Sequence, residues 1–308
     1  MRLTPLILGL IATVTLALAG CAHDAPTPAP YASLHDTADG GLPPIDAITS
    51  LLVVSPHPDD ETLCCAGVIQ RVIAAGGHVS VVWITDGDDS MLSMLLIEKS
   101  LLASRAKAED LADKRMQEAR AATRLLGIPA DRQLFLGYPD GGLPQLLTRN
   151  RTKPYHGQLT GDANVPYPQA LFPGHPYTGN SLQHDFAAVL DQIQPTLVLA
   201  PSLEDTHPDH RATGQLTTLA LKSRGELTKL HYWIVHGGEG WPSPRGLMKG
   251  IPLNMPTTGG HPPTSPLTLS DTEVERKALA ISTYQTQMEV MSPFLLSFAR
   301  TTELFSSP

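Results

Sequence analysis

Residues 51–61 read LLVVSPHPDDE, an uninterrupted apolar run that leads into a cluster of ionisable side chains. Four consecutive apolar residues at 51–54 are typical of a strand that is buried on both faces of a parallel sheet. From Glu61 to Ala75 the apolar spacing predicts a helix, which the two following glycines end. The sequence therefore predicts a strand whose carboxyl end carries the ionisable cluster, directly before a helix.

The alternation of strand and helix continues along the chain. Further apolar runs predict strands at 78–84, 133–136, 196–200 and 230–235. Helical spacing extends over 91–126 with a break near Ser104, and over 181–193, 208–221 and 271–291, the last capped by Ser270 or Asp271. This order predicts an α/β fold, a Rossmann-like open and mostly parallel sheet with helices on both faces. Its site is expected at the C-terminal edge of the strands.

A second ionisable cluster follows the strand predicted at 196–200. Residues 206–211 read THPDHR, and like residues 55–61 they place histidine and aspartate on either side of a proline. Imidazole and carboxylate groups form catalytic zinc sites, which have three protein ligands and one open position. Either cluster alone could be a turn, because proline and aspartate favour turns. Two such clusters at strand ends predict one metal site between them.

The chain resembles the PIG-L/LmbE deacetylases, which are zinc-dependent hydrolases that remove acetyl groups from N-acetylglucosaminyl compounds. The resemblance rests on five segments in order, namely SPHPDDE at 55–61, TDG at 85–87, Arg115-x-x-Glu118-Ala119, LGYPDG at 136–141 and HPDH at 207–210. It implies that His57, Asp60 and His210 bind the metal, that Asp59 is the general base and that His207 is the acid or electrostatic partner. The metal is expected to be Zn²⁺, with Fe²⁺ as the alternative, since histidine and aspartate accept both.

Other residues of these segments are expected to support the site. Asp209 is expected to orient His207, and Glu61 to support a neighbouring group or to cap the helix. The resemblance implies that Arg115 contacts the substrate, although a surface position on its helix is the alternative. Asp140 is expected to border the pocket and contact the substrate, or simply to stabilise its turn.

Two long segments, 137–180 and 236–269, are rich in glycine and proline and are expected to form walls or lids of a cleft. Trp241 lies in the second of them, where its ring could stack on a sugar or pin the loop to the core. We expect it in the cleft wall. The acidic residues 86–89 are expected to form a solvated turn, with sugar binding as the alternative.

The first 46 residues predict export and anchoring rather than a fold. Residues 1–20 resemble a bacterial lipoprotein signal peptide, and LAGC at 18–21 resembles a lipobox, which implies lipidation of Cys21. An ordinary secretory signal is the alternative. Residues 21–46 are rich in proline and alanine and are expected to form a tether, and 47–308 the deacetylase domain. This arrangement predicts a lipid-anchored protein of the bacterial cell envelope, most simply on the periplasmic side of the outer membrane.

The net charge bears on the expected partners, and the two neighbouring cysteines bear on the core. The formal net charge is −8 and no basic stripe is present, so no nucleic-acid partner is expected, and no protein partner is evident. Cys64 and Cys65 are neighbours, which rarely meet disulfide geometry, and we expect them to be small core residues.

The expected function is zinc-dependent removal of the acetyl group from an N-acetylglucosamine-type glycan or glycoconjugate. Its partners would be that N-acetylated sugar and, through the anchor, the membrane. The alternatives are a zinc amidase for another N-acyl group and a metal-containing sugar-binding lipoprotein without turnover.

Overall fold

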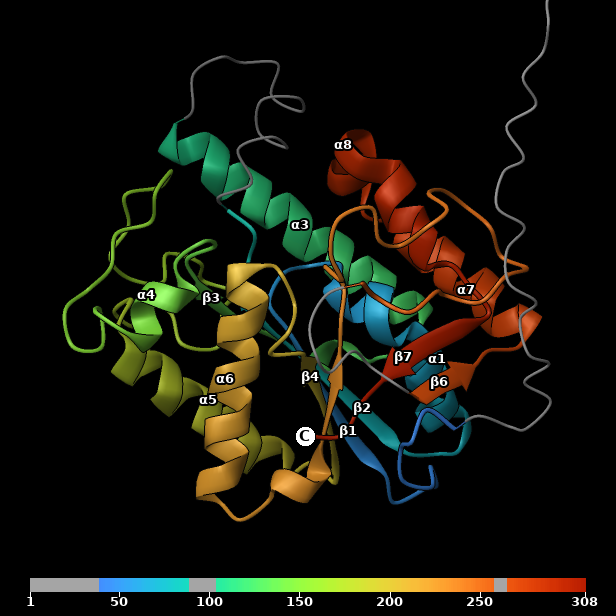
Figure 1. Ribbon diagram of the computed structural model, residues 1–308. Helices are drawn as coiled ribbons and strands as arrows, with labels where there is room; N and C mark the ends of the chain where they lie inside the picture. The colour runs from blue at the N-terminus through green and yellow to red at the C-terminus, as the bar shows by residue number, and fades with distance from the viewer. Residues whose placement is uncertain (1–38, 89–103, 258–264) are drawn as a thin grey trace, which may run out of the picture. The chain divides into compact units, whose positions relative to one another are not determined.

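A five-stranded parallel sheet forms the centre of the protein (Figure 1). The computed structural model describes residues 39–88, 104–257 and 265–308. The strand order is β3-β2-β1-β4-β5. The strands are β1 (Ser50–Ser55), β2 (His78–Thr85), β3 (Gln133–Tyr138), β4 (Leu197–Pro201) and β5 (Leu230–Trp233). All five predicted strands are confirmed, and so is the predicted α/β class.

The order in which the chain adds strands to the sheet reverses at β1. This reversal determines where the polar residues that follow the strands meet. The apolar residues 51–54 of β1 are fully buried, as expected of a central strand. On one side β1 pairs with β2, in register Ser50↔His78, and on the other with β4, in register Leu51↔Leu197. Strands β2 and β3 extend the sheet one way and β4 and β5 the other. Open α/β sheets bind ligands outside the carboxyl ends of strands at such a switch point.

Helices cover both faces of the sheet (Figure 1). One face carries α1 (Asp60–Ala74), α3 (Arg105–Leu125) and α7 (Asp271–Ile281), and the other carries α5 (Gly179–Ile193) and α6 (Pro208–Ser223). The short helix α4 (Leu143–Leu147) packs against α5 and α6. Helix α3 begins after Ser104, where the sequence predicts a break, and residues 91–103 of the predicted helix lie outside the described residues.

The predicted closing helix, 271–291, is wrong in its length. Ser270 caps α7 in a capping box as predicted, but α7 ends at Ile281 and a second helix, α8 (Gln285–Leu295), follows. The hydroxyls of Ser282 and Thr283 donate to carbonyls of the last turn of α7, at 2.8 and 2.7 Å, and such bonds compete with helix continuation. Beyond α8 the chain forms β7 (Thr302–Phe305), which pairs antiparallel with β6 (Ser265–Thr268), a ribbon that the sequence did not predict.

The described end of the predicted tether packs on this β6–β7 ribbon. Asp39 forms a bridge with Leu267, the amide of Gly40 donates to the carbonyl of Pro266 at 3.2 Å, and Leu42 is buried. These contacts join residues 39–46 to the folded domain. Cys21 and the rest of the tether lie outside the described residues. Within the described residues no helix is both long and apolar enough to cross a membrane.

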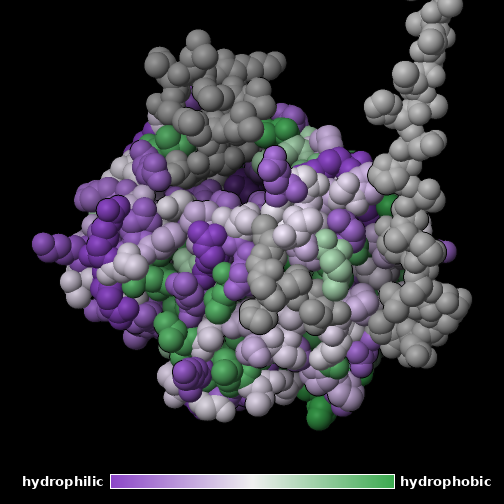
Figure 2. Space-filling view, in the orientation of Figure 1, coloured by the Kyte–Doolittle hydropathy of each residue, from purple (hydrophilic) through white to green (hydrophobic). Residues whose placement is uncertain are grey.

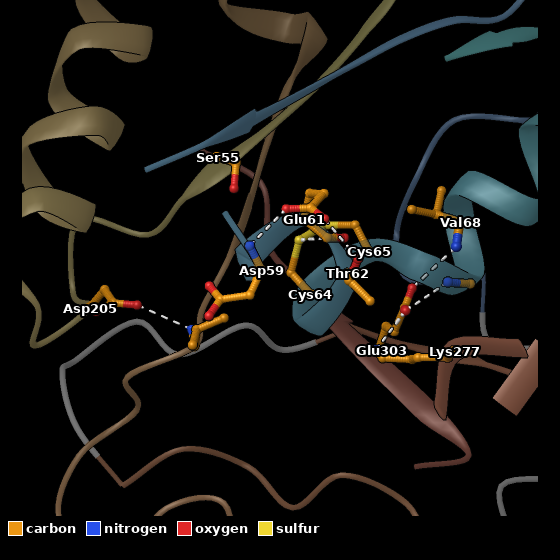
Figure 3. The surroundings of a disulfide bond; sticks show 12 residues. Ser55, Asp59, Glu61, Thr62, Cys64, Cys65, Val68, Asp205, Lys277 and Glu303 are labelled. Carbon is orange, nitrogen blue, oxygen red and sulfur yellow. Dashed lines mark hydrogen bonds and ion pairs between the residues drawn. A yellow bond between two sulfur atoms is a disulfide. The ribbon is translucent and has the colours of Figure 1, made fainter. Parts of the chain in front are cut away.

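The expectation that Cys64 and Cys65 stay unpaired is wrong, because a disulfide joins them (Figure 3). Their Cα atoms are 3.8 Å apart, the spacing of an ordinary trans peptide, so α1 continues through the pair. Both residues are buried, as the sequence predicts. The next turn of α1 is held by Glu303 of β7, which accepts from the amides of Gly67 and Val68 and pairs with the buried Lys277.

The surface in the orientation of Figure 1 is mixed in polarity. Figure 2 shows hydrophilic residues around a hollow in the upper part of this face, while apolar residues form small separate patches. Scattered apolar residues of this kind are ordinary for a folded domain.

Candidate active site

Three side chains from the two ionisable clusters converge where β1 and β4 end. Asp60 Oδ2 lies 3.2 Å from His57 Nδ1 and 3.2 Å from His210 Nε2. The two imidazole rings are 5.3 Å apart between centroids. All three side chains are buried. The sequence expectation that the two clusters meet at one place is therefore confirmed.

Local structure fixes these three positions. His57 lies in the turn between β1 and α1, and Asp60 is the first residue of α1. The amide of His57 donates to Asp60 Oδ2 at 3.0 Å. His210 lies in the first turn of α6, whose first residue, Pro208, suits the start of a helix. Because β1 and β4 are paired neighbours, the two turns lie side by side.

The donor set fits a divalent cation. Nε2 of His210 is buried and has no hydrogen-bond partner among the described residues, although it faces Asp60 Oδ2. Two ligands with bonds of ~2.0–2.1 Å to one tetrahedral ion are roughly 3.3 Å apart, which is close to both observed separations. Two nitrogens and one carboxylate oxygen are a usual protein ligand set for zinc.

His210 is oriented by Asp205, a residue that the sequence analysis missed. Asp205 Oδ2 lies 3.1 Å from His210 Nδ1 and also accepts from the amides of Val235 and His236. Burial opposes protonation of His210, but the carboxylates of Asp205 and Asp60 outweigh it and raise the pKa of the ring to about 9. Asp205 thus holds the ring so that Nε2 faces Asp60. Its position directly before the THPDHR segment, after a strand, was the available signal.

The predicted role of Asp209 is wrong, since its carboxylate contacts His57 rather than His207. Asp209 Oδ2 lies 3.4 Å from His57 Nε2, and the carboxylate also accepts from the amides of Gly141 and Leu143. Only the backbone amide of Asp209 reaches His207, donating to Nδ1 at 3.3 Å. His207 caps α6 in an extended conformation whereas Asp209 is helical, so their side chains diverge.

Asp140 shares this contact with His57. Its Oδ1 lies 3.1 Å from His57 Nε2, while its own amide donates to Asp88 Oδ1 at 3.1 Å. Two carboxylates therefore face one ring nitrogen of His57, while the other nitrogen faces Asp60. Asp140 lines the cleft, as predicted, and its contact with a substrate stays a prediction.

Asp59 lies beside this group with its carboxyl in the cleft. Burial raises the pKa of Asp59 to about 8, and the positive charge of Arg115 opposes the rise. Arg115 Nη2 is 3.6 Å from Asp59 Oδ2 and donates to the carbonyl of Pro58 at 2.9 Å. Arg115 is buried and lines the cleft, so a surface position on α3 is wrong. As expected, Glu61 supports its neighbours, because it accepts from the amide of Asp59 at 3.2 Å.

His207 is flanked by three other imidazoles. Its ring centroid lies 4.9 Å from that of His57, 5.0 Å from that of His210 and 5.1 Å from that of His236. Burial, reinforced by these neighbours, lowers the pKa of His207 to about 3, so its ring is neutral. Since Nδ1 accepts the amide of Asp209, the ring proton resides on Nε2.

The expectation of a solvated turn at residues 86–89 is wrong for its described part. Asp86 and Asp88 are buried, and Asp88 accepts from the phenol of Tyr167 at 3.1 Å and from the amide of Asp140. Burial raises the pKa of Asp86 well above its usual range. Asp89 lies outside the described residues. The turn follows β2, whose carboxyl end points to the same edge as that of β1, so it packs under the 137–142 loop.

Comparison with known proteins identifies the protein family of this chain. A family model described as PIG-L: GlcNAc-PI de-N-acetylase matches residues 52–221. The chain belongs to the PIG-L family. The matched span contains both ionisable clusters and every polar side chain that faces His57 or Asp60 in the contacts above.

Curated relatives of this PIG-L family chain are named as deacetylases. A 1D-myo-inositol 2-acetamido-2-deoxy-alpha-D-glucopyranoside deacetylase of Mycobacterium sp. (strain KMS) is 26% identical over 213 residues, 67% of this chain and 61% of the relative. A protein of the same name from Actinosynnema mirum is 26% identical over 253 residues, 78% of this chain and 81% of the relative. The chain thus spans about three fifths of the Mycobacterium relative.

Solved structures share the fold. The conserved protein TT1542 from Thermus thermophilus has a TM-score of 0.52 at 22% identity, covering 85% of this chain and 95% of that one. N,N'-diacetylchitobiose deacetylase from Pyrococcus horikoshii, in complex with its inhibitor MPG, has a TM-score of 0.51 at 21% identity, covering 83% and 82%. These likenesses support the PIG-L fold.

The cleft also has walls that lie outside the span matched by the PIG-L family model. It has a volume of about 350 Å³, and its polar side holds the residues described above together with His236 and Gln287. Its apolar side is formed by Leu63, Val235, Met291, Phe294 and Leu295. His236 stacks on Phe294 with centroids 5.6 Å apart, and the exposed Arg245 lies over the same ring at 4.7 Å. Helix α8 therefore supplies much of the apolar wall.

Trp241 is not part of this wall, so its predicted place in the cleft is wrong. Only 2% of its surface is exposed, its indole donates to the carbonyl of Asn254 at 2.8 Å, and its ring meets that of Phe298 edge to face. Burial removes a large apolar area from water, so the ring pins the 236–257 segment to the core.

Proposed function

We propose that this chain hydrolyses the acetamide of an N-acetylglucosamine-type glycan or glycoconjugate, releasing acetate and a free amine. The single observation that carries the proposal is the position of the Asp60 carboxylate, 3.2 Å from a ring nitrogen of His57 and 3.2 Å from one of His210, beside the carboxyl of Asp59 in the cleft. Membership of the PIG-L family and the printed names of its relatives support the same reaction class.

The residues present suit a zinc ion held by His57 Nδ1, Asp60 and His210 Nε2. When bound, such an ion supplies polarisation of the amide carbonyl and lowers the pKa of water. Asp205 keeps His210 in its orientation, and the carboxylates of Asp140 and Asp209 do the same for His57.

Asp59 transfers the proton, and His207 is the electrostatic partner. Asp59, in its ionised form, takes the proton from water as the water oxygen adds to the carbonyl carbon. His207, which also lines the cleft and is neutral with its proton on Nε2, donates a hydrogen bond to the reacting amide. The carbon–nitrogen bond then breaks, and the amine leaves with the proton that Asp59 took up. Arg115, which is 3.6 Å from Asp59, keeps that carboxyl turned into the cleft.

The apolar wall favours a second candidate, hydrolysis of a longer N-acyl group. Met291, Phe294 and Leu295 would pack against alkyl carbons as readily as against the apolar face of a sugar. A series from N-acetyl to N-butyryl glucosamine, with detection of the released amine, separates the two. An acetamidase shows kcat/KM falling along the series, and a general amidase shows it rising or flat.

The deciding test compares the wild type with Asp59→Asn, with and without chelator, on N-acetylglucosamine oligomers. The proposal predicts amine release that chelator abolishes and that Asp59→Asn lowers by about 10²–10⁴-fold. A wild type that binds these sugars but hydrolyses no N-acyl sugar is a binding protein, and the proposed function is then wrong.

We also propose that residues 1–20 direct export and that Cys21 carries the lipid anchor, with the domain in the cell envelope on the periplasmic side of the outer membrane. The apolar run before LAGC at 18–21 supports this. Mass spectrometry of the N-terminal peptide from membranes tests it. A mature chain that begins at a lipid-modified Cys21 is expected, and a mature chain that begins elsewhere contradicts the proposal.

A further inference from the structure

The backbone of Asp59 has an unusual conformation. Its φ is 129° and its ψ is −33°, in a region that residues with a side chain rarely adopt. Such a conformation persists only where neighbouring groups hold it. The carbonyl of Asp59 accepts from the amides of Thr62 and Leu63 at 3.0 Å each, and its amide donates to Glu61 Oε2. Glu61 therefore supplies the one side-chain contact to the backbone of the proposed base among the described residues.

Glu61 itself accepts hydrogen bonds from four donors in three separate parts of the chain. It is fully buried, and besides the amide of Asp59 it accepts from the indole of Trp83 on β2 at 2.9 Å and from the hydroxyl of Thr62 at 2.7 Å. The phenol of Tyr284 donates to Oε1, the oxygen that also accepts from Thr62, whereas Asp59 and Trp83 donate to Oε2. Tyr284 is fully buried and stands between α7 and α8, outside the residues that the family model matches.

The direction of these contacts matters for the site. In Figure 3 the amide of Asp59 points to Glu61, while the carboxyl group of Asp59 extends the opposite way. A rotation of the peptide that breaks the amide contact would therefore also turn the carboxyl away from its place in the cleft. The side chain of Glu61 does not line the cleft and contacts none of the three proposed ligands' side chains in the described structure.

We propose that Glu61 and Tyr284 are positioning residues, which hold Asp59 in its positive-φ conformation so that its carboxyl faces the reacting water. The proposal rests on the function proposed above. It assigns to the C-terminal segment, through Tyr284, a part in placing the general base.

Two substitutions test it with little change of volume. Glu61→Gln replaces one acceptor oxygen by an amide nitrogen, so at least one of its four donors loses its partner. Tyr284→Phe removes only the phenol hydroxyl. Because a small misplacement of a catalytic group can cost about 10²-fold, we expect kcat to fall about 10–100-fold in Glu61→Gln and about 3–10-fold in Tyr284→Phe, with KM unchanged.

The matched control is Tyr232→Phe. Tyr232 is also a buried tyrosine, and its hydroxyl bonds Thr218 Oγ1 at 2.7 Å, away from the cleft. It is expected to keep wild-type kcat, KM and zinc content. Zinc content is also expected to stay unchanged in Glu61→Gln and Tyr284→Phe.

A double-mutant cycle with Asp59→Asn separates positioning from general damage to the fold. If Glu61 and Tyr284 act through Asp59, their substitution lowers kcat no further in the Asp59→Asn background. An equal fold-loss in both backgrounds, or no loss in the wild-type background, overturns the proposal.

A crystal structure of each variant gives a readout that does not need activity. We expect the φ of residue 59 to leave the positive region, or its carboxyl to move, in Glu61→Gln and to a smaller extent in Tyr284→Phe. An unchanged Asp59 in both overturns the proposal. Should the wild type hydrolyse no N-acyl sugar, the proposed function fails while these structures still decide whether Glu61 and Tyr284 position Asp59.

Discussion

Replacing Asp59 by glycine is expected to give a more stable protein than replacing it by alanine. A residue with a side chain held at φ 129° costs about 1–3 kcal/mol, and glycine adopts positive φ without that cost. Glycine in turn gains freedom in the unfolded chain, which lowers stability by about 0.4–1 kcal/mol relative to alanine. The balance leaves Asp59→Gly more stable than Asp59→Ala by about 0.5–2 kcal/mol.

Urea unfolding of both variants at pH 7 in the presence of chelator measures this difference. Both lack the carboxyl group, so burial of that group and its contact with Arg115 cancel in the comparison. The exposed Ala74 in the last turn of α1 provides the control, because Ala74→Gly should lower the free energy of unfolding by about 0.5–1 kcal/mol. An Asp59→Ala protein at least as stable as Asp59→Gly would refute the claim that this backbone is strained.

Three further results are expected. Burial raises the pKa of Asp59 to about 8 in the folded chain, against about 3.9 when unfolded, so the folded state of the metal-free protein holds the proton more tightly. The free energy of unfolding should therefore fall as pH rises from about 4 to about 8, and urea titrations should show a smaller fall in Asp59→Asn. Trp241→Ala should lower the free energy of unfolding by about 3–5 kcal/mol with KM unchanged. An unchanged melting temperature with a raised KM would instead show that Trp241 contacts the substrate in the cleft. Asp205→Asn should weaken zinc binding by about 10–100-fold in competition with a chromogenic chelator, and wild-type affinity would show that Asp205 does not orient His210.

Local signals in the sequence predicted much of the sheet and the central side chains. The runs at 51–54 and 197–200 are apolar throughout because β1 and β4 are buried on both faces, so both strands could be predicted from the sequence alone. The pairing of His57 and Asp60 with His210 follows from the rule that adjacent parallel strands present their carboxyl ends at one edge.

The errors concern contacts that only the folded chain determines. Asp209 follows His207 closely in sequence, yet the helical turn between them directs its carboxylate to His57, 152 positions away. Trp241 lies in a loop rich in glycine and proline, which gives no sign of whether its ring meets the cleft or Phe298. Tyr284 interrupts an otherwise helical pattern, and its contact with Glu61 joins segments 223 positions apart.

The proposed mechanism requires a single divalent cation between His57, Asp60 and His210. Anomalous diffraction at the zinc edge from crystals of the zinc-loaded protein tests it. We predict one strong peak within about 2.0–2.2 Å of His57 Nδ1, an Asp60 carboxylate oxygen and His210 Nε2. A peak elsewhere, for instance between the other ring nitrogen of His57, Asp140 and Asp209, or no peak at full zinc loading, would contradict it.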